Sequence, residues 1–405
     1  MLSQLNKNDK RNYLLLMIGA SFHFGSLAFM FLLPRFIKHI GGNESDMGFI
    51  FGIAIIPALL VSPFAGYLSD KMSGKLLAIT GTSIAILSTL SFLFVSNLTA
   101  LIYILRILQG GGHAMFFAVV FGLMAHIIPE QNRAEGIAYF AVAVQFGQSG
   151  GTLLAEQIIA HWGFNFYFIG SFLIGLVAIS MVSLVKIANH ETNAALSQTL
   201  KQPVHSESYL SAICRKNYIG GFILIFILGG GFGSVLQFIT PYLDYLHKAA
   251  LTIRKIPTSY FIPPALITVA LSRLFLSRIT DRVGRNKIIF INFPIFILTI
   301  FLITFIRSGY TTLLTAIMFG LAYGFLFPAL NAVILSRTEV RHRGKVSGVL
   351  VMLFDSAFFG FAFISGPLAF NFGYFNMYYI MALIMLAGFL IYIFFEKILK
   401  NERMK

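Results

Sequence analysis

A short polar segment rich in arginine separates two long apolar stretches in the second half of the chain. It reads Ser277-Arg278-Ile279-Thr280-Asp281-Arg282-Val283-Gly284-Arg285-Asn286-Lys287. Asp281 stands where the first apolar stretch ends, Gly284 permits a tight turn, and basic residues follow. The flanking stretches, 257–280 and 287–306, are each long enough to cross a membrane as a helix, which takes about 20 apolar residues. The segment is therefore predicted to be a loop between two membrane spans.

Apolar stretches of this length recur along the whole chain. Hydrophobic residues make up 57% of the 405 positions and charged residues only 11%, whereas a soluble domain carries about 25% charged residues. The protein is therefore predicted to be an all-α membrane protein with twelve transmembrane helices. The predicted spans are 12–35, 47–70, 75–96, 99–127, 133–159, 163–187, 218–244, 257–280, 287–306, 311–336, 343–369 and 373–396.

Lys and Arg residues predict the orientation of these spans, because they concentrate in cytoplasmic loops. With both termini in the cytoplasm, the cytoplasmic tails and loops hold 22 of the 30 basic residues and the opposite loops hold six. Topology thus explains the formal net charge of +15, and no nucleic-acid partner is needed. We expect a multi-pass membrane protein with both termini in the cytoplasm.

Several other classes of protein are disfavoured by what the sequence lacks. Residues 1–11 are polar and basic and have no apolar core of a signal peptide, so the first apolar stretch is expected to remain as a helix. Cys214 is the single cysteine and cannot form an internal disulfide. No Walker loop, metal-ligand cluster or nucleophile motif is present in the sequence. We expect no enzymatic activity, no metal and no cofactor.

The sequence repeats itself with an offset of about 210 residues. Two parallel halves are predicted, 1–187 and 218–405, each with six helices, and a polar cytoplasmic linker, 188–217, joins them. The matching pairs are Asp70 with Asp281, Gly110 with Gly320, Arg133 with Arg343, and Gly150 with Gly360. Parallel repeats of this kind occur in transporters whose substrate site lies near mid-membrane between the halves.

Two of the loops resemble the signature loop of the major facilitator superfamily. That signature has a glycine, an acid four residues later, a basic residue, a glycine and two more basic residues. In the second-half copy, Ser277 replaces the leading glycine; in the first-half copy, Ser73 and Gly74 replace the turn glycine and the arginine after it. The resemblance covers nearly the whole chain and implies two pseudo-symmetric six-helix bundles. The first-half copy reads Gly66-Tyr67-Leu68-Ser69-Asp70-Lys71-Met72-Ser73-Gly74-Lys75.

The resemblance also implies a gating role for these loops. In the family, the acid and its basic neighbours hold the two halves together on the cytoplasmic side when the outside is open. Lys75, Arg133 and the start of the eleventh span near Arg343 are alternative basic partners for Asp70. The residues implied in gating are Asp70, Lys71, Lys75, Arg133, Asp281, Arg282, Gly284, Arg285 and Arg343.

An arginine lies inside the fourth predicted span. Arg106 opens the segment Arg106-Ile107-Leu108-Gln109-Gly110-Gly111-Gly112-His113-Ala114. A charged side chain at the centre of a span costs about 2.5 kcal/mol or more and usually faces a polar cavity or a partner. The family has an arginine, a glutamine and a glycine at this spacing, so the resemblance implies a part in proton coupling. The alternative is a structural arginine bonded to backbone carbonyls.

The tenth span is similar to that of the efflux-permease branches of the superfamily, which include drug and arabinose efflux proteins. It reads Gly320-Leu321-Ala322-Tyr323-Gly324-Phe325-Leu326-Phe327-Pro328-Ala329-Leu330-Asn331-Ala332, and Arg343-Gly344 and Asp355 follow. Efflux members usually carry Gly-Pro pairs in the fifth span. This chain keeps the glycines but has neither proline in Gly147-Gln148-Ser149-Gly150-Gly151-Thr152.

A few other ionisable residues lie at depth in the predicted spans. Asp355 is twelve residues into its span, about 18 Å from the cytoplasmic end, and His23 lies at a similar depth. His113 is well inside the fourth span, whereas Glu156 is expected near the outer end of the fifth, within reach of water. Such groups can change protonation state during transport. Asp355 is the leading candidate for the proton carrier, with Arg106, His23, His113 and Glu156 as further candidates; each histidine could instead bond a backbone carbonyl.

Four polar residues in the spans are candidates for binding the substrate. They are Gln145, Gln237, Tyr323 and Asn331. Gln145 occupies the repeat position of Asp355. Both glutamines could equally brace neighbouring helices.

We therefore expect a secondary active transporter that exports a small organic compound in exchange for protons by alternating access, with a proton gradient as the energy source. It is expected to work as a monomer in the lipid bilayer, in the inner membrane of a prokaryote. A proton-coupled importer of a small nutrient has the same architecture and remains an alternative. A lipid flippase or a membrane sensor that reuses the fold is an alternative from another class.

Overall fold

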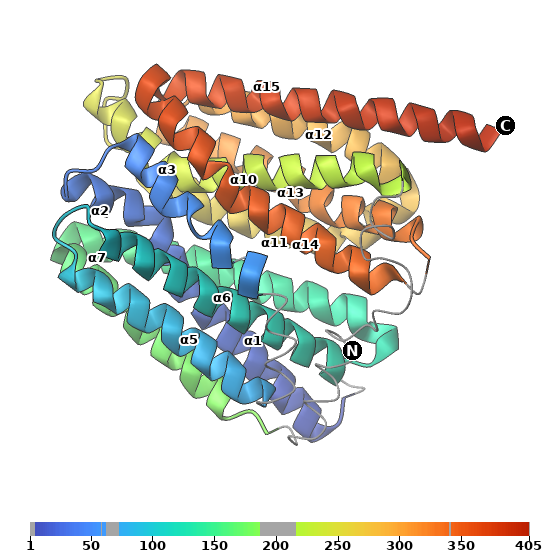
Figure 1. Cartoon of the computed structure of the whole chain (residues 1–405), viewed down its shortest axis with the longest axis horizontal. Coiled ribbons are helices and arrows are strands. Elements are labelled where there is room, and N and C mark those ends of the chain that lie inside the picture. The colour runs from blue at the N-terminus through green and yellow to red at the C-terminus, as the bar shows by residue number, and fades with distance from the viewer. Residues whose placement is uncertain (1–4, 58, 62–72, 187–215, 340–341, 405) are drawn as a thin grey trace. The chain divides into compact units, whose positions relative to one another are not determined.

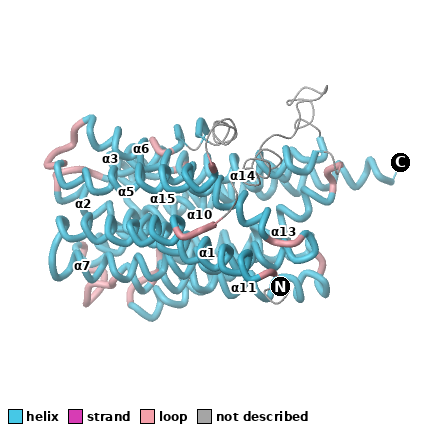
Figure 2. Tube along the Cα trace, turned by 90° about the horizontal axis from the view of Figure 1, so that it is seen from below, coloured by secondary structure: helices cyan, strands magenta, loops and turns pink. Residues whose placement is uncertain are grey.

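The computed structural model describes residues 5–57, 59–61, 73–186, 216–339 and 342–404, and this part of the chain contains helices and loops but no strand (Figures 1 and 2). Side chains are not described at 125–126, 130, 133–134, 216–217, 275–282, 344–345 and 399–404. The α-helices are α1 (Lys7–Ala28), α2 (Leu33–His39), α3 (Glu44–Gly52), α5 (Gly74–Ser91), α6 (Ala100–Ile127), α7 (Arg133–Ser183), α10 (Lys216–Lys248), α11 (Ile262–Val283), α12 (Arg285–Ile303), α13 (Gly309–Ser336), α14 (Arg343–Gly360) and α15 (Ala362–Met404). The short 3₁₀ turns are η1 (Phe29–Leu32), η2 (Phe92–Phe94), η3 (Glu130–Asn132) and η4 (Thr258–Tyr260).

The helices confirm the prediction of an all-α membrane protein. Nine stretches of the described chain are long and apolar enough to cross a membrane. Two of them, Glu135–Ser183 and Val346–Ile398, have 49 and 53 residues, and a single crossing needs only about 20. Each of these two stretches therefore holds two of the predicted spans.

A glycine with positive φ divides each of the two longest helices. Gly163 interrupts α7 with φ 79° and ψ −171°, and Gly373 interrupts α15 with φ 79° and ψ 162°. Only glycine reaches such backbone angles without strain. The predicted sixth and twelfth spans begin at these same two positions.

Several predicted spans differ from the helices at their ends, and the local cause is clear at two of the starts. The first helix begins at Lys7 instead of 12, because the Asn6 side chain accepts a hydrogen bond from the Asp9 backbone at 2.8 Å and caps it. The eighth begins at Ile262 instead of 257, because Pro257 has extended angles and η4 precedes the helix. Apolar content locates a span, whereas local capping sets where its helix begins.

Contacts divide the chain into two compact units. Unit 1 comprises Met1–Asn43, Ile53–Lys201 and Pro257–Leu274; unit 2 comprises Glu44–Gly52, Gln202–Ile256 and Phe275–Lys405. Each unit thus contains a short segment from the opposite predicted half. Nearly all of the predicted linker, 188–217, lies outside the described residues, so the boundary between the halves stays a prediction.

Glycines bring α1 and α7 into backbone contact within unit 1. A Cβ atom on Gly147 would lie 2.0 Å from the Ser21 carbonyl oxygen, and one on Gly151 would lie 2.1 Å from that of Gly25. The core beside this contact is apolar and draws on α1, α5, α6 and α7; its buried members include Leu16, Ala20, Leu77, Phe116, Val120, Leu123 and Phe140. The glycines that resemble the efflux motif therefore act in helix packing here.

Unit 2 has a matching contact between α10 and α14. A Cβ atom on Gly229 would lie 2.5 Å from the Phe354 carbonyl oxygen, and one on Gly233 would lie 2.2 Å from that of Phe358. The short helix α3 packs in the same unit on the start of α15. There, a Cβ atom on Gly48 would lie 2.4 Å from the Ala362 carbonyl oxygen.

Candidate functional site

Unit 1 holds a chain of hydrogen-bonding side chains between three helices. His23 of α1 lies 3.1 Å from His113 of α6, between Nε2 of the former and Nδ1 of the latter. Thr82 of α5 lies 3.3 Å from the other ring nitrogen, Nδ1, of His23. Phe116 stacks on His23 with ring centroids 3.8 Å apart. The structure thus brings two predicted proton-coupling candidates together, on helices far apart in sequence.

The hydrogen bonds of Thr82 assign the tautomers of both histidines. The Thr82 hydroxyl donates to the Ala78 carbonyl oxygen at 3.0 Å, so its oxygen accepts a hydrogen bond from the His23 Nδ1–H group at 3.3 Å. His23 Nε2 is then an acceptor, and His113 Nδ1 donates to it. His113 Nε2 is left as the unprotonated nitrogen at the end of this series of hydrogen bonds. One proton can be added there without rearranging the other bonds.

Arg106 is buried in α6, where 4% of its surface is exposed. Its guanidinium donates to the Gln109 amide oxygen, and the Gln109 amide donates in turn to the Thr89 hydroxyl at 2.7 Å. Gln109, an uncharged residue on the same helix, therefore accepts the hydrogen bond of the Arg106 guanidinium. Its predicted part in proton coupling stays a prediction.

Gln145 of α7 presents a buried amide oxygen. The residue is 7% exposed, and within the described chain its Oε1 atom has no hydrogen-bond partner. A buried polar atom without a partner is costly unless a ligand or water satisfies it. The geometry is consistent with the predicted substrate-binding role of Gln145, and it offers no helix-bracing bond for this oxygen in the described part of the protein.

In unit 2, Asp355 lies on α14 and is partly buried. Among the residues that the structure describes, its carboxylate takes part in no ion pair. A carboxylate in a membrane span without a cationic partner usually has a functional role.

Gln237 and an aromatic layer lie beside the helix turn that carries Asp355. Gln237 Nε2 donates to the Phe358 carbonyl oxygen at 2.6 Å, while its buried Oε1 atom lacks a partner in the described chain. Tyr323 stacks on Phe232 with centroids 3.8 Å apart, and Phe354 lies 6.1 Å from Tyr323. The unit thus combines an acid, an amide oxygen and aromatic faces.

Asn331, the fourth substrate candidate, is bonded within its own helix. Its Nδ2 atom donates to the Phe327 carbonyl oxygen at 2.8 Å, four residues earlier in α13. That bond satisfies one amide proton locally. The binding role of Asn331 stays a prediction, with less support than that of Gln237.

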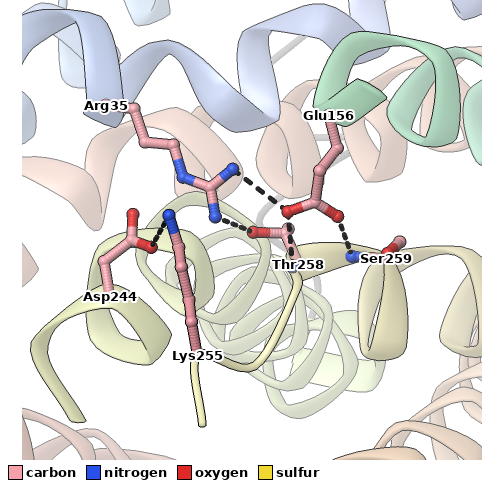
Figure 3. Close-up of polar contacts among 6 residues, drawn as sticks. All are labelled: Arg35, Glu156, Asp244, Lys255, Thr258 and Ser259. Atoms are coloured by element: carbon pink, nitrogen blue, oxygen red, sulfur yellow. Dashed lines mark hydrogen bonds and ion pairs between the residues drawn. The ribbon is translucent and has the colours of Figure 1, made fainter. Parts of the chain in front are cut away.

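Glu156 lies near the end of the first part of α7, inside a polar cluster in unit 1 (Figure 3). Its Oε1 atom accepts from Arg35 Nη1 at 3.0 Å and from the Thr258 backbone at 2.8 Å. Its Oε2 atom accepts from the Ser259 backbone at 2.8 Å, and Arg35 Nη2 also donates to the Thr258 hydroxyl at 3.3 Å. We call Arg35, Glu156, Thr258 and Ser259 the Glu156 cluster.

The expectation that Glu156 is within reach of water is wrong. Glu156 is only 8% exposed, because Arg35 and the turn η4 cover it. Removing one partner from a buried ion pair costs about 3–5 kcal/mol, since the other charge is left uncompensated. We assign Glu156 a structural role in this conformation, and its part in proton coupling stays a prediction.

Among the described residues of unit 2, two pairs of a lysine or arginine with an acid lie at helix ends. Lys255 lies 3.5 Å from Asp244 and is 56% exposed (Figure 3). Arg337, just after α13, binds Glu396 of α15 in two parallel bonds of 2.6 and 2.7 Å, and the bonds to this carboxylate raise the pKa of Arg337. Bidentate geometry makes the second pair the stronger one.

The predicted gating loops are described only in part. Gly284 has φ 87° and separates α11 from α12, as the turn prediction requires, and Arg285 begins α12. Lys75 donates to the carbonyl oxygens of Ser183 and Val185, at the end of α7, and so contributes to helix packing. Arg343 begins α14 and donates to the Thr338 carbonyl oxygen at 3.4 Å. Asp70 and Lys71 lie outside the described residues, and the side chains of Arg133, Asp281 and Arg282 are not described.

Sequence reasoning missed four participants in these sites. Thr82 orients His23, but a threonine inside an apolar span carries no distinctive signal. Arg35 stands at the end of the first predicted span, and that position could have marked it. The backbone donors of Thr258 and Ser259 cannot be recognised from residue type at all.

A wholly helical membrane protein with buried histidine, acid and amide groups on its spans belongs to the class of polytopic transporters. The family model of the Major Facilitator Superfamily matches residues 15–362 and 258–403. These matches cover most of the chain, and the chain therefore belongs to the Major Facilitator Superfamily. It is a secondary transporter, which confirms the resemblance and the prediction that the protein is not an enzyme.

Two relatives that match in sequence are distant, at 24% and 26% identity. Multidrug resistance protein 2 of Bacillus subtilis (strain 168) is 24% identical over 329 residues, which cover 78% of each chain. Quinolone resistance protein NorA of Staphylococcus aureus (strain MRSA252) is 26% identical over 219 residues, or 53% of each chain. The efflux-like resemblance is thus confirmed as distant homology.

Solved structures share the fold. A mutant of the nucleoside transporter NupG has a TM-score of 0.76 at 14% identity, covering 95% of this chain and 99% of that one. The human organic anion transporter MFSD10 (TETRAN) has a TM-score of 0.65 at 14% identity, covering 96% and 100%. At these identities the likeness establishes the fold alone.

Proposed function

We propose that this transporter exports small organic compounds in exchange for protons, by alternating access, from the cytoplasm of a prokaryote. The names of the distant relatives, a multidrug resistance protein and a quinolone resistance protein, support export of organic compounds. The family relationship supports movement of two halves around a central site.

The observation that carries the proposal is the chemistry around Asp355 in unit 2. An acid without an ion-pair partner in the described chain lies on the same helix as Phe354 and Phe358. The unpartnered amide oxygen of Gln237 and the stacked face of Tyr323 belong to the same packed region. Carboxylate, amide oxygen and aromatic faces suit an organic cation or an amphiphile with a protonated amine.

In this proposal a proton and a cationic substrate compete for Asp355. A bare carboxylate in a medium of low dielectric is unfavourable, so it is stabilised either by a proton or by a bound cation. Release of the substrate outside would be driven by proton binding, and release of the proton inside would prepare the acid for the next substrate. Arg106, His23 and His113 are candidates for adjusting this exchange from unit 1.

The test is a proton-flux assay in sealed vesicles that hold the purified protein. A panel of organic cations, amphiphiles, sugars and metallophores would be added to vesicles with an imposed pH gradient. We expect at least one compound to collapse the gradient with the wild-type protein, and Asp355→Asn to abolish the effect. Glu339→Gln is the matched control, because Glu339 is an exposed acid at the end of α13.

The outcomes test three parts of the proposal separately: the proton carrier, the coupling to protons and the direction of transport. An equal response from Asp355→Asn would exclude Asp355 as the proton carrier and direct attention to His23, His113 and Glu156. Compound movement that does not change the gradient would exclude proton coupling. For direction, greater sensitivity of a deletion strain to toxic compounds would support export, whereas failure to grow on one nutrient would support import.

A further inference from the structure

We propose that the Glu156 cluster is a latch that closes the predicted outer side of the transporter and must open in every transport cycle. The inference rests on the alternating access proposed above. It assigns a conformational role to Arg35, Glu156 and the backbone of Thr258 and Ser259.

The latch joins residues of the two predicted halves. Arg35 and Glu156 come from 1–187, whereas Thr258 and Ser259 come from 218–405, and all four belong to compact unit 1 (Figure 3). In alternating access the two halves separate on one side of the membrane at a time. The contacts of Glu156 with Thr258 and Ser259 therefore cannot persist when this side opens.

The donor set makes this contact strong when closed. One carboxylate accepts from a guanidinium and from two successive backbone N–H groups, at 3.0, 2.8 and 2.8 Å. Charge-assisted bonds of this kind are stronger than neutral ones. The N–H groups of Thr258 and Ser259 start the turn η4, where the helix itself supplies no acceptor. Glu156 thus caps a second-half turn from a first-half helix.

A second contact shows what the latch covers. Ser149 lies seven residues before Glu156 on α7, about two turns or 10 Å away on the same face. Its hydroxyl is 3.4 Å from the Pro263 carbonyl oxygen, and the residue is 2% exposed. The segment that carries η4 and the start of α11 therefore covers Ser149. Its side chain should become accessible to reagents when the latch opens.

The experiment measures the accessibility of a thiol at position 149. The chain has one native cysteine, so Cys214→Ser gives a background without cysteine. Ser149→Cys then adds the reporter, and the rate of its reaction with a bulky maleimide is measured on the purified protein in detergent. Ser171→Cys is the control reporter, because Ser171 is fully buried against Ser26, and both residues belong to the first predicted half.

Two substitutions should open the latch. Glu156→Gln removes the charge while keeping the size of the side chain. Thr258→Pro removes one backbone donor; Pro257 already has ψ 146°, which suits a residue before proline, and proline is favoured at the first position of a helical turn. We expect either change to raise the labelling rate at position 149 by about tenfold or more, as the loss of a hydrogen bond to a charged group would produce.

Two matched controls should leave the labelling rate within about twofold, as expected for weak or exposed contacts. Thr258→Val removes only the hydroxyl contact with Arg35, at 3.3 Å, and keeps the backbone donor. Lys255→Gln removes the exposed ion pair with Asp244.

A charge swap tests the role of the backbone donors. In the double variant Arg35→Glu with Glu156→Arg we expect the latch to stay open and the labelling rate at position 149 to stay high. The reason is that an arginine at position 156 cannot accept hydrogen bonds from the backbone of Thr258 and Ser259.

An unchanged labelling rate in both Glu156→Gln and Thr258→Pro would overturn the latch. Faster labelling at position 171 as well would mean that the fold has loosened, and would also count against it. Neither readout needs a substrate or a proton gradient. Failure of the latch would therefore leave the proposed transport activity standing, and failure of the vesicle assay would leave the latch measurement valid.

Discussion

At the scale of single residues, one hydroxyl group determines the protonation pattern of two histidines. Thr82 donates to its own helix and accepts from His23 Nδ1, so His23 Nε2 must accept from His113. The acceptor that remains, His113 Nε2, is the nitrogen at which this chain of bonds can take up a proton. The two imidazoles therefore form a directional pair, which neither could form alone.

Replacing Thr82 should reverse the direction of this pair. In Thr82→Val the shape is nearly preserved but His23 Nδ1 loses its acceptor, so we expect His23 to carry its proton on Nε2 and donate to His113. Nitrogen-15 NMR of labelled histidine distinguishes the two tautomers. Thr299→Val is the control, because within the described chain the Thr299 hydroxyl bonds only to its own helix, at 2.7 Å from the Ile295 carbonyl oxygen. A His23 tautomer that is the same in wild type and Thr82→Val would contradict the assignment.

At the scale of helices, close packing depends on single glycines facing a neighbouring backbone. Gly151 of α7 faces the Gly25 carbonyl oxygen of α1, whereas Gly150, its neighbour in sequence, has open space around its Cβ position. The sequence motif contains both glycines and gives no reason to distinguish them. The rotation of α7 about its axis decides which one is required.

These two glycines give a matched pair of substitutions. Gly151→Ala would place a methyl group 2.1 Å from the Gly25 carbonyl oxygen, which forces α1 and α7 apart and should cost about 1–3 kcal/mol. Gly150→Ala meets nothing within 4 Å and should be neutral or stabilising, by about 0.5–1 kcal/mol from helix propensity. Thermal unfolding of the purified proteins in detergent measures both. Equal midpoints for the two variants would refute the packing argument.

At this scale the sequence predicted most helices well and the candidate sites less well. Hydropathy located the spans, and the breaks at Gly163 and Gly373 coincide with predicted span starts. The burial of Glu156 was predicted wrongly, because depth along α7 says nothing about Arg35 or η4 lying over the carboxylate. Single-helix depth can be derived from the sequence, whereas the cover from other helices cannot.

At the scale of the whole molecule, the distribution of Lys and Arg predicts the orientation in the membrane. Basic residues are concentrated in the tails and in alternate loops, and the predicted linker 188–217 lies among them. The family relationship establishes a multi-pass membrane protein. The cytoplasmic location of the termini and of the linker stays a prediction.

The single cysteine provides a test of that orientation. Cys214 lies in the predicted linker, so a membrane-impermeant maleimide should label it in inverted membrane vesicles and leave it unlabelled in intact cells with a permeable outer layer. The reason is that linker charges are held on the cytoplasmic side during insertion. Cys214→Ser is the control for background labelling. Labelling in intact cells instead would reverse the predicted topology.

The sequence by itself determined the class of this protein, its helical content, the approximate spans and the family. The long apolar stretches predict helices, because a helix satisfies all its backbone hydrogen bonds within the segment that crosses the lipid. The family could be recognised because its loop motifs consist of contiguous residues. Only the tertiary structure decided which polar groups meet. His23 contacts His113 across 90 positions, and Glu156 contacts Thr258 across 102. Such pairs depend on the rotation and depth of separate helices to within about an ångström, because hydrogen bonds weaken steeply outside that range.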